Sequence, residues 1–173
     1  MMNLSRSDIL IYRKKYDILS RKLSDYLQEK QIRDWLNNKD YLNRKYFLKI
    51  CMWKSKRPKK LYEDELNSEE RIINITKLSF HSKDEYFKIK VLQLLKGVSW
   101  PVASTILHFM QPSRYMIMDF RAIWSLGWQQ PKSYDFYFWT RYTKTVRLIS
   151  KKNKVSLRTL DKALWFYSKE NQK

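Results

Sequence analysis

Apolar residues recur at intervals of three and four along almost the whole chain. This spacing gathers them on one face of an α-helix, and no segment shows the convincing alternation of a half-buried β-strand. The sequence therefore predicts an all-α fold. We expect helices over residues 7–18, 21–37, 40–54, 58–65, 68–80, 84–96, 100–110, 119–126, 134–150 and 156–169. Ser68, Asp84 and Ser156 are expected to cap three of these helices.

Glycine is scarce in this sequence. An average chain of this length holds roughly a dozen glycines at about 7% usage, and this one holds 2. Gly97 and Gly127 each follow an apolar helical segment, where a positive φ or a close backbone approach is expected. The least regular stretches are expected at 128–133 and 151–155.

Two of the predicted helices lie only about four residues apart and form a helical hairpin. The first has an apolar face at Phe87, Val91, Leu94 and Leu95 and ends at Gly97. The second begins with Ser99 as N-cap and tolerates Pro101 in its first turn. Its inward residues are Val102, Ala103, Ile106, Leu107 and Met110. Such a hairpin points free N–H groups at a phosphate, but a hairpin buried in the core fits the spacing equally well.

The chain is strongly basic, with 36 Lys and Arg against 17 Asp and Glu and a net charge of +19 at pH 7. A polyanion is the expected partner, and a lysine-rich solvated surface or an acidic membrane surface is the alternative. On segment 134–150 the charges form a stripe. It consists of Arg141, Lys144, Arg147 and Lys151. The stripe either follows a DNA backbone or is a solvated face.

The single cysteine, Cys51, excludes an intrachain disulfide and a four-cysteine zinc or iron–sulfur site built from this chain. His81 and His108 show no metal-ligand spacing, so we expect no metal centre. Nowhere do about 18 apolar residues run together as a membrane span requires. We expect a protein of the cytoplasm, associated with the nucleoid, or of the nucleus in a eukaryotic cell.

Roughly residues 84–128 resemble a known family. The segments LLKGVSWPVASTILHF and YMIMDFRAIWSLG are similar to the helix-hairpin-helix DNA glycosylase superfamily, the endonuclease III-like base-excision repair enzymes. The hairpin glycine and valine of that family fall at Gly97 and Val98, its small second-helix residue at Ala103, and its catalytic aspartate at Asp119.

The resemblance implies a glycosylase-like helical bundle and a phosphate-binding hairpin. The implied phosphate-binding residues are Gly97, Val98, Ser99, Trp100 and Pro101. It also implies that hairpin carbonyls between Gly97 and Trp100 can coordinate a monovalent cation, and we expect no other cofactor.

Two residues depart from the family pattern. Ser99 replaces the second hairpin glycine, and Pro101 stands where lyase-type members carry a nucleophilic lysine. A Schiff base with deoxyribose is therefore unavailable from that position. The resemblance thus implies at most a monofunctional glycosylase.

Asp119 is a lone carboxylate between Met118 and Phe120 in an apolar run, where a charge needs a reason. Helix capping alone accounts for it. A capping carboxylate at the edge of a cleft can also stabilise an oxocarbenium-like sugar or orient a water molecule. Arg121 is placed to pair with Asp119 or to reach a phosphate beside it.

An extruded base would need aromatic faces around it. The candidates are Trp53, Trp100 in the hairpin and Trp124 on the helix that Asp119 begins. Trp53 is interleaved with Lys54, Lys56 and Arg57, whose charges are suited to phosphates. Plain core packing is the alternative for each tryptophan, and above all for Trp124.

The sequence thus predicts one monomeric helical protein with two lobes around a cleft. Residues 56–127 would form the hairpin-bearing lobe, and residues 1–55 with 128–173 the second. We expect it to bind double-stranded DNA and hydrolyse the N-glycosidic bond of a damaged or mismatched base. A non-catalytic DNA-binding protein and an RNA-binding or ribosome-associated protein are the alternatives.

Overall fold

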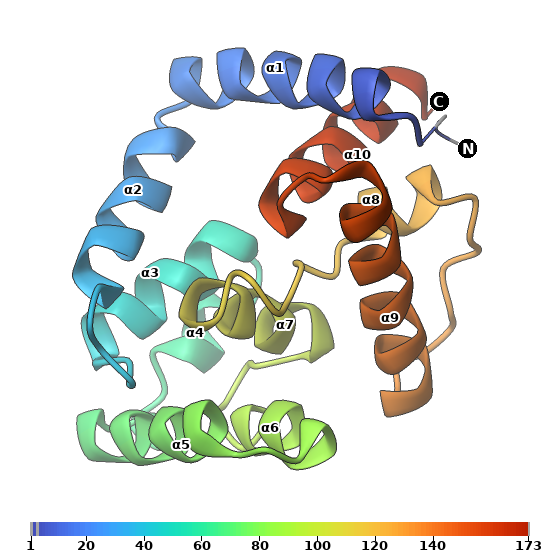
Figure 1. The fold of residues 1–173 in the computed structure, drawn as a ribbon. Helices are drawn as coiled ribbons and strands as arrows, with labels where there is room; N and C mark the ends of the chain where they lie inside the picture. The colour runs from blue at the N-terminus through green and yellow to red at the C-terminus, as the bar shows by residue number, and fades with distance from the viewer. Residues whose placement is uncertain (1, 3, 173) are drawn as a thin grey trace. The chain divides into compact units, whose positions relative to one another are not determined.

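The computed structural model of the protein describes residue 2 and residues 4–172. These residues contain ten α-helices and no β-strand, which confirms the all-α prediction (Figure 1). The helices are α1 (Arg6–Lys22), α2 (Asp25–Leu36), α3 (Arg44–Lys54), α4 (Lys59–Tyr62), α5 (Glu69–His81), α6 (Glu85–Leu92), α7 (Trp100–Met110), α8 (Phe120–Ser125), α9 (Phe136–Asn153) and α10 (Leu157–Asn171). Among the described residues, no helix combines the length and apolar character that crossing a bilayer requires.

The chain folds into two compact units. The terminal unit combines Met1–Tyr26 with Pro112–Lys173, and the central unit is Leu27–Gln111. The expected lobe of residues 56–127 therefore differs from the central unit at both ends. Residues 27–55 belong with the hairpin because α3 packs against α5 and α7, whereas residues 112–127 belong with the terminal unit because α8 packs against α10.

In the central unit, α7 is buried on all sides. Every residue from Val102 to Met110 is buried. These include Ser104 and Thr105, whose hydroxyls donate to the Pro101 carbonyl at 2.8 Å. Helices α3 and α6 pack against it, and α5 packs against α6. Phe47 and Ile50 of α3, which are fully buried, contribute to this core.

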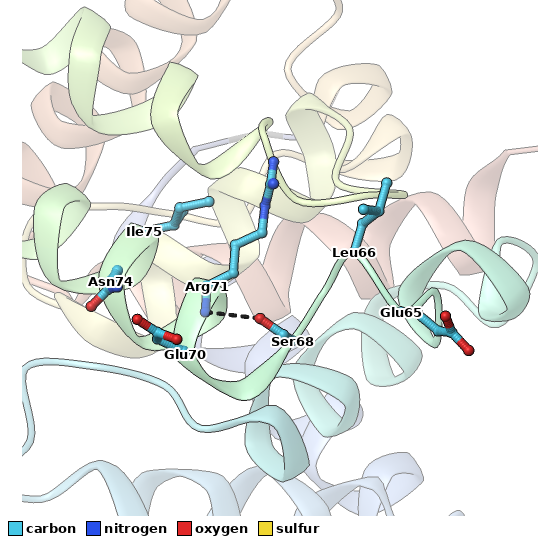
Figure 2. Close-up of a pocket in the computed structure, with 7 residues that line it drawn as sticks. All are labelled: Glu65, Leu66, Ser68, Glu70, Arg71, Asn74 and Ile75. Carbon is cyan, nitrogen blue, oxygen red and sulfur yellow. Dashed lines mark hydrogen bonds between the residues drawn. The ribbon is translucent and has the colours of Figure 1, made fainter.

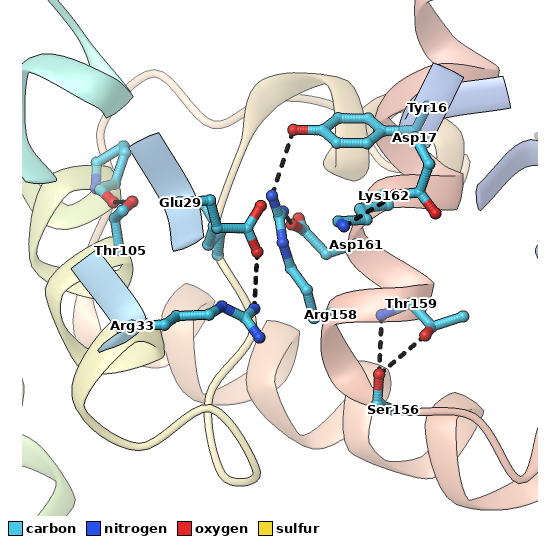
Figure 3. Close-up of polar contacts among 12 residues, drawn as sticks. Tyr16, Asp17, Glu29, Arg33, Thr105, Ser156, Arg158, Thr159, Asp161 and Lys162 are labelled. Carbon is cyan, nitrogen blue, oxygen red and sulfur yellow. Dashed lines mark hydrogen bonds and ion pairs between the residues drawn. The ribbon is translucent and has the colours of Figure 1, made fainter. Parts of the chain in front are cut away.

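In the terminal unit, α10 packs against α1, α8 and α9. Its contact with α1 includes polar groups. The side chain of Arg158 pairs with Asp161 and donates from Nη2 to the hydroxyl of Tyr16 at 3.2 Å (Figure 3). Lys162 of α10 pairs with Asp17 of α1 at 2.9 Å. The two ends of the sequence are thus fastened into one unit by apolar packing and by ion pairs.

The caps explain where several helices begin. The side chains of Ser68, Asp84 and Ser156 accept hydrogen bonds from the backbone N–H groups of Arg71, Phe87 and Thr159, as predicted. Two predicted ends were wrong. Helix α6 stops at Leu92 rather than near residue 96, and α9 continues to Asn153 through much of the stretch expected to be irregular.

Helix α6 does not use the face predicted for it. Val91 and Leu95 are buried, but Phe87 and Leu94 are 45% and 58% exposed. The reason is Lys88, a fully buried residue whose Nζ donates to the carbonyls of Ser79 and Phe80 at 2.6 and 2.8 Å. Turning Lys88 inward to satisfy the end of α5 turns Phe87 outward, and Leu94 lies beyond the end of the helix.

Candidate functional site

The hairpin between α6 and α7 turns at Gly97, which has a φ of +81°. A Cβ atom at this position would lie 2.7 and 2.9 Å from two ring carbons of Tyr62 and 3.0 Å from the Cβ of Leu61. The backbone of the turn therefore approaches the end of α4 more closely than any side chain permits. Both the left-handed conformation and the close approach favour glycine here.

The side chain of Asn67 fixes the turn through hydrogen bonds. Its side chain is fully buried, its oxygen accepts the N–H of Lys96 at 2.9 Å, and its Nδ2 donates to the Lys96 carbonyl at 3.1 Å. The same Nδ2 lies within 3.1 Å of the carbonyls of Leu61 and Tyr62. One amide side chain thus links the residue before Gly97 to the end of α4.

After the turn, α7 begins with Ser99 as its N-cap, and Pro101 lies in the first turn, as predicted. The Ser99 side chain makes no capping hydrogen bond, and the first backbone bond runs from Ala103 N–H to the Ser99 carbonyl at 2.8 Å. N–H groups in the first turn of a helix have no acceptor inside the helix. In α7 these belong to Trp100 and Val102, because proline has none.

The hairpin carbonyls are partly engaged. The Lys96 carbonyl accepts from Asn67, the Leu95 carbonyl from Val98 N–H at 3.1 Å, and the Ser99 carbonyl from Ala103. Each keeps a second lone pair. The Ser99 oxygen lies within the range Gly97–Trp100 for which a monovalent cation is predicted, whereas the Leu95 and Lys96 oxygens lie just before that range. Cation binding between Gly97 and Trp100 stays a prediction.

A buried, extended segment leads to Asp119 in the terminal unit. Tyr115, Met116, Ile117 and Met118 are each at most 3% exposed. Their polar backbone is partly satisfied by α9, since the Tyr142 hydroxyl donates to the Ile117 carbonyl at 2.7 Å. The segment ends where Asp119 reaches a half-buried position.

Asp119 is the N-cap of α8, and its carboxylate accepts the N–H of Arg121 at 2.9 Å. The charge of Asp119 contributes to the raised pKa values of two tyrosines. Burial, and then the charges of Asp161 and Asp119, raise the pKa of Tyr142 well above its ordinary value. Burial is also the main cause of the raised pKa of Tyr134, to which Asp119 adds. Tyr142 is therefore a protonated hydrogen-bond donor at neutral pH, as its bond to the Ile117 carbonyl requires.

Arg121 extends away from its own backbone contact with Asp119. Its guanidinium carbon lies 5.4 Å from the ring centroid of Trp165 on α10 and 5.1 Å from that of Phe120. Stacking of this kind holds a guanidinium plane in place while leaving its edges for hydrogen bonds. The expectation that Arg121 reaches a phosphate stays a prediction.

The residues predicted for one site belong to both units. Gly97, Val98, Ser99, Trp100 and Pro101 lie in the central unit, and Asp119 and Arg121 lie in the terminal unit.

The structure places the proposed base-pocket residues around the end of α3. Trp53 is half-buried and meets Phe109 of α7 edge to face, with ring centroids 5.4 Å apart. Lys54 ends α3, and Lys56 and Arg57 are exposed just after it. Trp53 therefore packs on the core of the central unit, Lys54 is half-buried beside it, and Lys56 and Arg57 face solvent. Trp100 is half-buried, and Lys90 lies 5.6 Å from its ring centroid.

Three of the four residues of the predicted basic stripe on α9 are exposed to solvent. Arg141, Lys144 and Lys151 are exposed. Arg147 instead turns back, donating from Nε to the Arg114 carbonyl at 2.7 Å and stacking over the ring of Tyr115.

An open groove lies elsewhere in the central unit, beside the start of α5 (Figure 2). Its volume is about 440 Å³, and it is lined by Glu65, Leu66, Ser68, Glu70, Arg71, Asn74 and Ile75. Arg71 donates across to the Leu94 carbonyl at 3.0 Å. The groove carries no residue predicted for function. Within residues 2 and 4–172, no group of three His, Cys, Asp or Glu side chains is arranged to hold a metal ion.

Two residues that shape the site were missed in the sequence. Asn67 sits in a polar stretch before an N-cap, which looks like an ordinary loop and gives no signal of burial. Tyr142 did carry a signal, because it belongs to the apolar face of its helix, where a buried hydroxyl needs an acceptor.

Comparison of the chain with models of protein families, with curated proteins and with solved structures finds no match.

Proposed function

We propose that the protein binds duplex DNA through the α6–α7 hairpin and hydrolyses the N-glycosidic bond of a damaged or mismatched base. The observation that carries the proposal is the turn at Gly97, whose left-handed backbone lies against Tyr62 and presents the start of α7. Backbone N–H groups at the positive end of a helix donate hydrogen bonds to phosphate oxygens, and they bind the phosphate whatever the base sequence is. The net charge of +19 supplies the long-range attraction.

Asp119 is the proposed catalytic residue. In the reaction, water adds to the anomeric carbon of the deoxyribose as the bond from that carbon to the base nitrogen breaks. The base leaves with the bonding electron pair and takes up one proton, and the attacking water loses one, so the products are a neutral free base and an abasic sugar with a new hydroxyl group. A carboxylate held at a helix N-terminus at the end of a rigid buried segment can stabilise the positive charge on the sugar and orient the water. Pro101 offers no amine, so strand cleavage through a Schiff base is not proposed.

A non-catalytic DNA-binding protein is the second candidate, and one observation favours it. The Asp119 carboxylate already serves α8 as its cap, and a cap needs no chemistry to explain it.

A single-turnover assay separates the two candidates. Duplexes carrying uracil, 8-oxoguanine, an alkylated purine or a G·T mismatch are each incubated with excess protein and then treated with alkali, which cuts at abasic sites. The proposal predicts alkali-dependent cleavage at the lesion on at least one duplex. Salt-sensitive binding without cleavage on the whole panel would select the non-catalytic candidate.

A further inference from the structure

The outward face of α9 combines cations with two unusually exposed apolar side chains. Tyr137 is 78% exposed and Leu148 is 69% exposed, the two highest values among the exposed large apolar residues that the structure describes. They share this face with exposed cations. These are Arg141, Lys144, Lys151 and Lys152. We call the six residues together the α9 face.

The spacing of the α9 face shows that its members lie together. From Tyr137 the positions follow at intervals of four and three residues through Arg141, Lys144 and Leu148 to Lys151, which is the repeat of one side of an α-helix. Arg147 lies at the edge of this side, and its half-buried side chain contacts Arg114 and Tyr115 instead. The opposite side of α9 is buried through Trp139, Tyr142, Thr143 and Val146. The helix is therefore fixed to the terminal unit by one side and presents the other to solvent.

The charge of the α9 face is uncompensated within its own helix. The 18 residues of α9 include five Lys and Arg and no Asp or Glu. The first turn is held by Asp135, whose carboxylate accepts the N–H of Phe138 at 2.7 Å. Within the α9 face, Arg141 stacks over the ring of Trp128, with its guanidinium carbon 4.4 Å from the ring centroid. This stacking fixes the stem of Arg141 in place.

We propose that the α9 face is a second DNA-binding surface, which follows the phosphate backbone of a duplex. The choice of duplex DNA rests on the proposed function. Arg141 and Lys151 are ten residues apart, about 15 Å along the helix at 1.5 Å per residue. With one phosphate per 3.4 Å of each strand, the cations span several consecutive phosphates. Tyr137 and Leu148 contact deoxyribose sugars of the same DNA backbone.

The layout of the α9 face argues against a membrane surface as its partner. A helix that lies in a lipid interface has a continuous apolar side, with its cations on the other face. In α9 two of the cations, Arg141 and Lys144, lie between Tyr137 and Leu148, so neither apolar residue can enter lipid without them. Charged oxygens separated by less polar sugars complement this order.

The test measures duplex affinity over a range of salt concentrations by fluorescence anisotropy, with an undamaged labelled duplex. The triple variant Arg141→Gln/Lys144→Gln/Lys151→Gln should lower the magnitude of the log–log salt slope by about 2 to 3, since each lost phosphate contact removes about 0.9. The matched control removes the same charge from α1 with Arg6→Gln/Lys14→Gln/Lys22→Gln, and its slope should stay near that of the wild type. Equal changes in both triples, or no change in the α9 triple, would overturn the proposal.

The apolar members of the face are tested separately. Tyr137→Ala should weaken duplex binding about 5-fold with the salt slope unchanged, and Tyr137→Phe should bind as the wild type does, because the contact uses the ring. Wild-type affinity in Tyr137→Ala would contradict the assigned contact. Tighter binding to structured RNA or to anionic phosphatidylserine vesicles, lost in the α9 triple, would assign the face to another partner.

Base release is measured on the same proteins. If the α9 triple binds undamaged duplex normally while the wild type still releases a base, the α9 proposal fails and the proposed function stands. If the wild type releases no base but the α9 triple loses salt-dependent duplex binding, the proposed function fails and the α9 proposal stands.

Discussion

Two constraints exclude a Cβ atom at position 97, and both favour glycine there. An alanine there would adopt a left-handed φ and would press its methyl group against the ring of Tyr62. The ring is fully buried, so it cannot move aside without disturbing its neighbours. The turn that presents α7 therefore depends on the absence of a side chain at this residue.

Gly97→Ala should lower the free energy of unfolding by roughly 2–4 kcal/mol, the sum of the left-handed strain and the overpacking. Gly127→Ala is the comparison, because Gly127 also has a positive φ, of 76°, but lies in the other unit. Urea unfolding gives both values. Duplex affinity should fall in the Gly97 variant and persist in the Gly127 variant. A Gly97→Ala protein with wild-type stability and affinity would refute the structural account of the hairpin.

At the scale of single residues, the sequence predicted the left-handed turn because glycine is rare in it. It did not predict Asn67, because burial of a polar residue depends on which backbone groups the fold brings around it. The amide of Asn67 is satisfied by the carbonyls of Leu61, Tyr62 and Lys96, and Lys96 is 29 residues away in the chain. No local pattern encodes that contact.

At the scale of elements, α9 has two roles on its two sides. Its inner side holds the segment 115–118 through the hydrogen bond from Tyr142 to the Ile117 carbonyl. That segment leads directly to Asp119, so the role that we propose for Tyr142 is a positioning one rather than a catalytic one. Its outer side presents the proposed DNA-binding face.

Tyr142→Phe should lower the free energy of unfolding by about 1–3 kcal/mol, because the buried carbonyl of Ile117 loses a donor. If the hydroxyl also positions Asp119, the single-turnover rate of base release should fall while duplex affinity stays constant. Tyr16→Phe serves as a control, since it removes a hydroxyl from the α1–α10 contact instead. An equal fall in rate for both variants would indicate a general loss of stability rather than positioning.

The helices were predictable because each carries its own apolar period and several carry their own caps. The orientation of α6 was not, since the period of its apolar residues suggested Phe87 and Leu94 as inward. Burial of Lys88 reverses that choice, because two carbonyls at the end of α5 accept its ammonium group. Apolar spacing alone cannot anticipate a lysine that is buried to satisfy a neighbouring helix. The same limit applies to Arg147, which the α9 stripe was expected to expose.

At the scale of the whole molecule, the terminal unit joins the first helix of the chain to the last three. Long-range packing of α1 on α10 makes this unit, and no short pattern in either segment specifies the partner. The sequence analysis did predict that the two chain ends form one lobe, but it placed the boundaries at residues 55 and 127. The structure places them at Tyr26 and Gln111.

The charge of the whole molecule predicts how duplex affinity responds to salt. If about 4 to 9 phosphates are neutralised, the plot of log affinity against log salt concentration should have a slope of roughly −4 to −8. Anisotropy titrations at several salt concentrations measure it. A flat response would contradict both DNA-binding candidates, since the net charge of +19 would then play no part in recognition.

The proposed catalytic role of Asp119 depends on its negative charge, and a single substitution removes that charge. Wild type and Asp119→Asn are run side by side in the single-turnover assay on the lesion panel, with duplex affinity measured in parallel. Asparagine caps a helix as well as aspartate does, so α8 and the fold should be retained while the negative charge is lost. We predict base release by the wild type that disappears in Asp119→Asn at unchanged affinity. Equal base release by both proteins, or none by either on any lesion, would contradict the assignment.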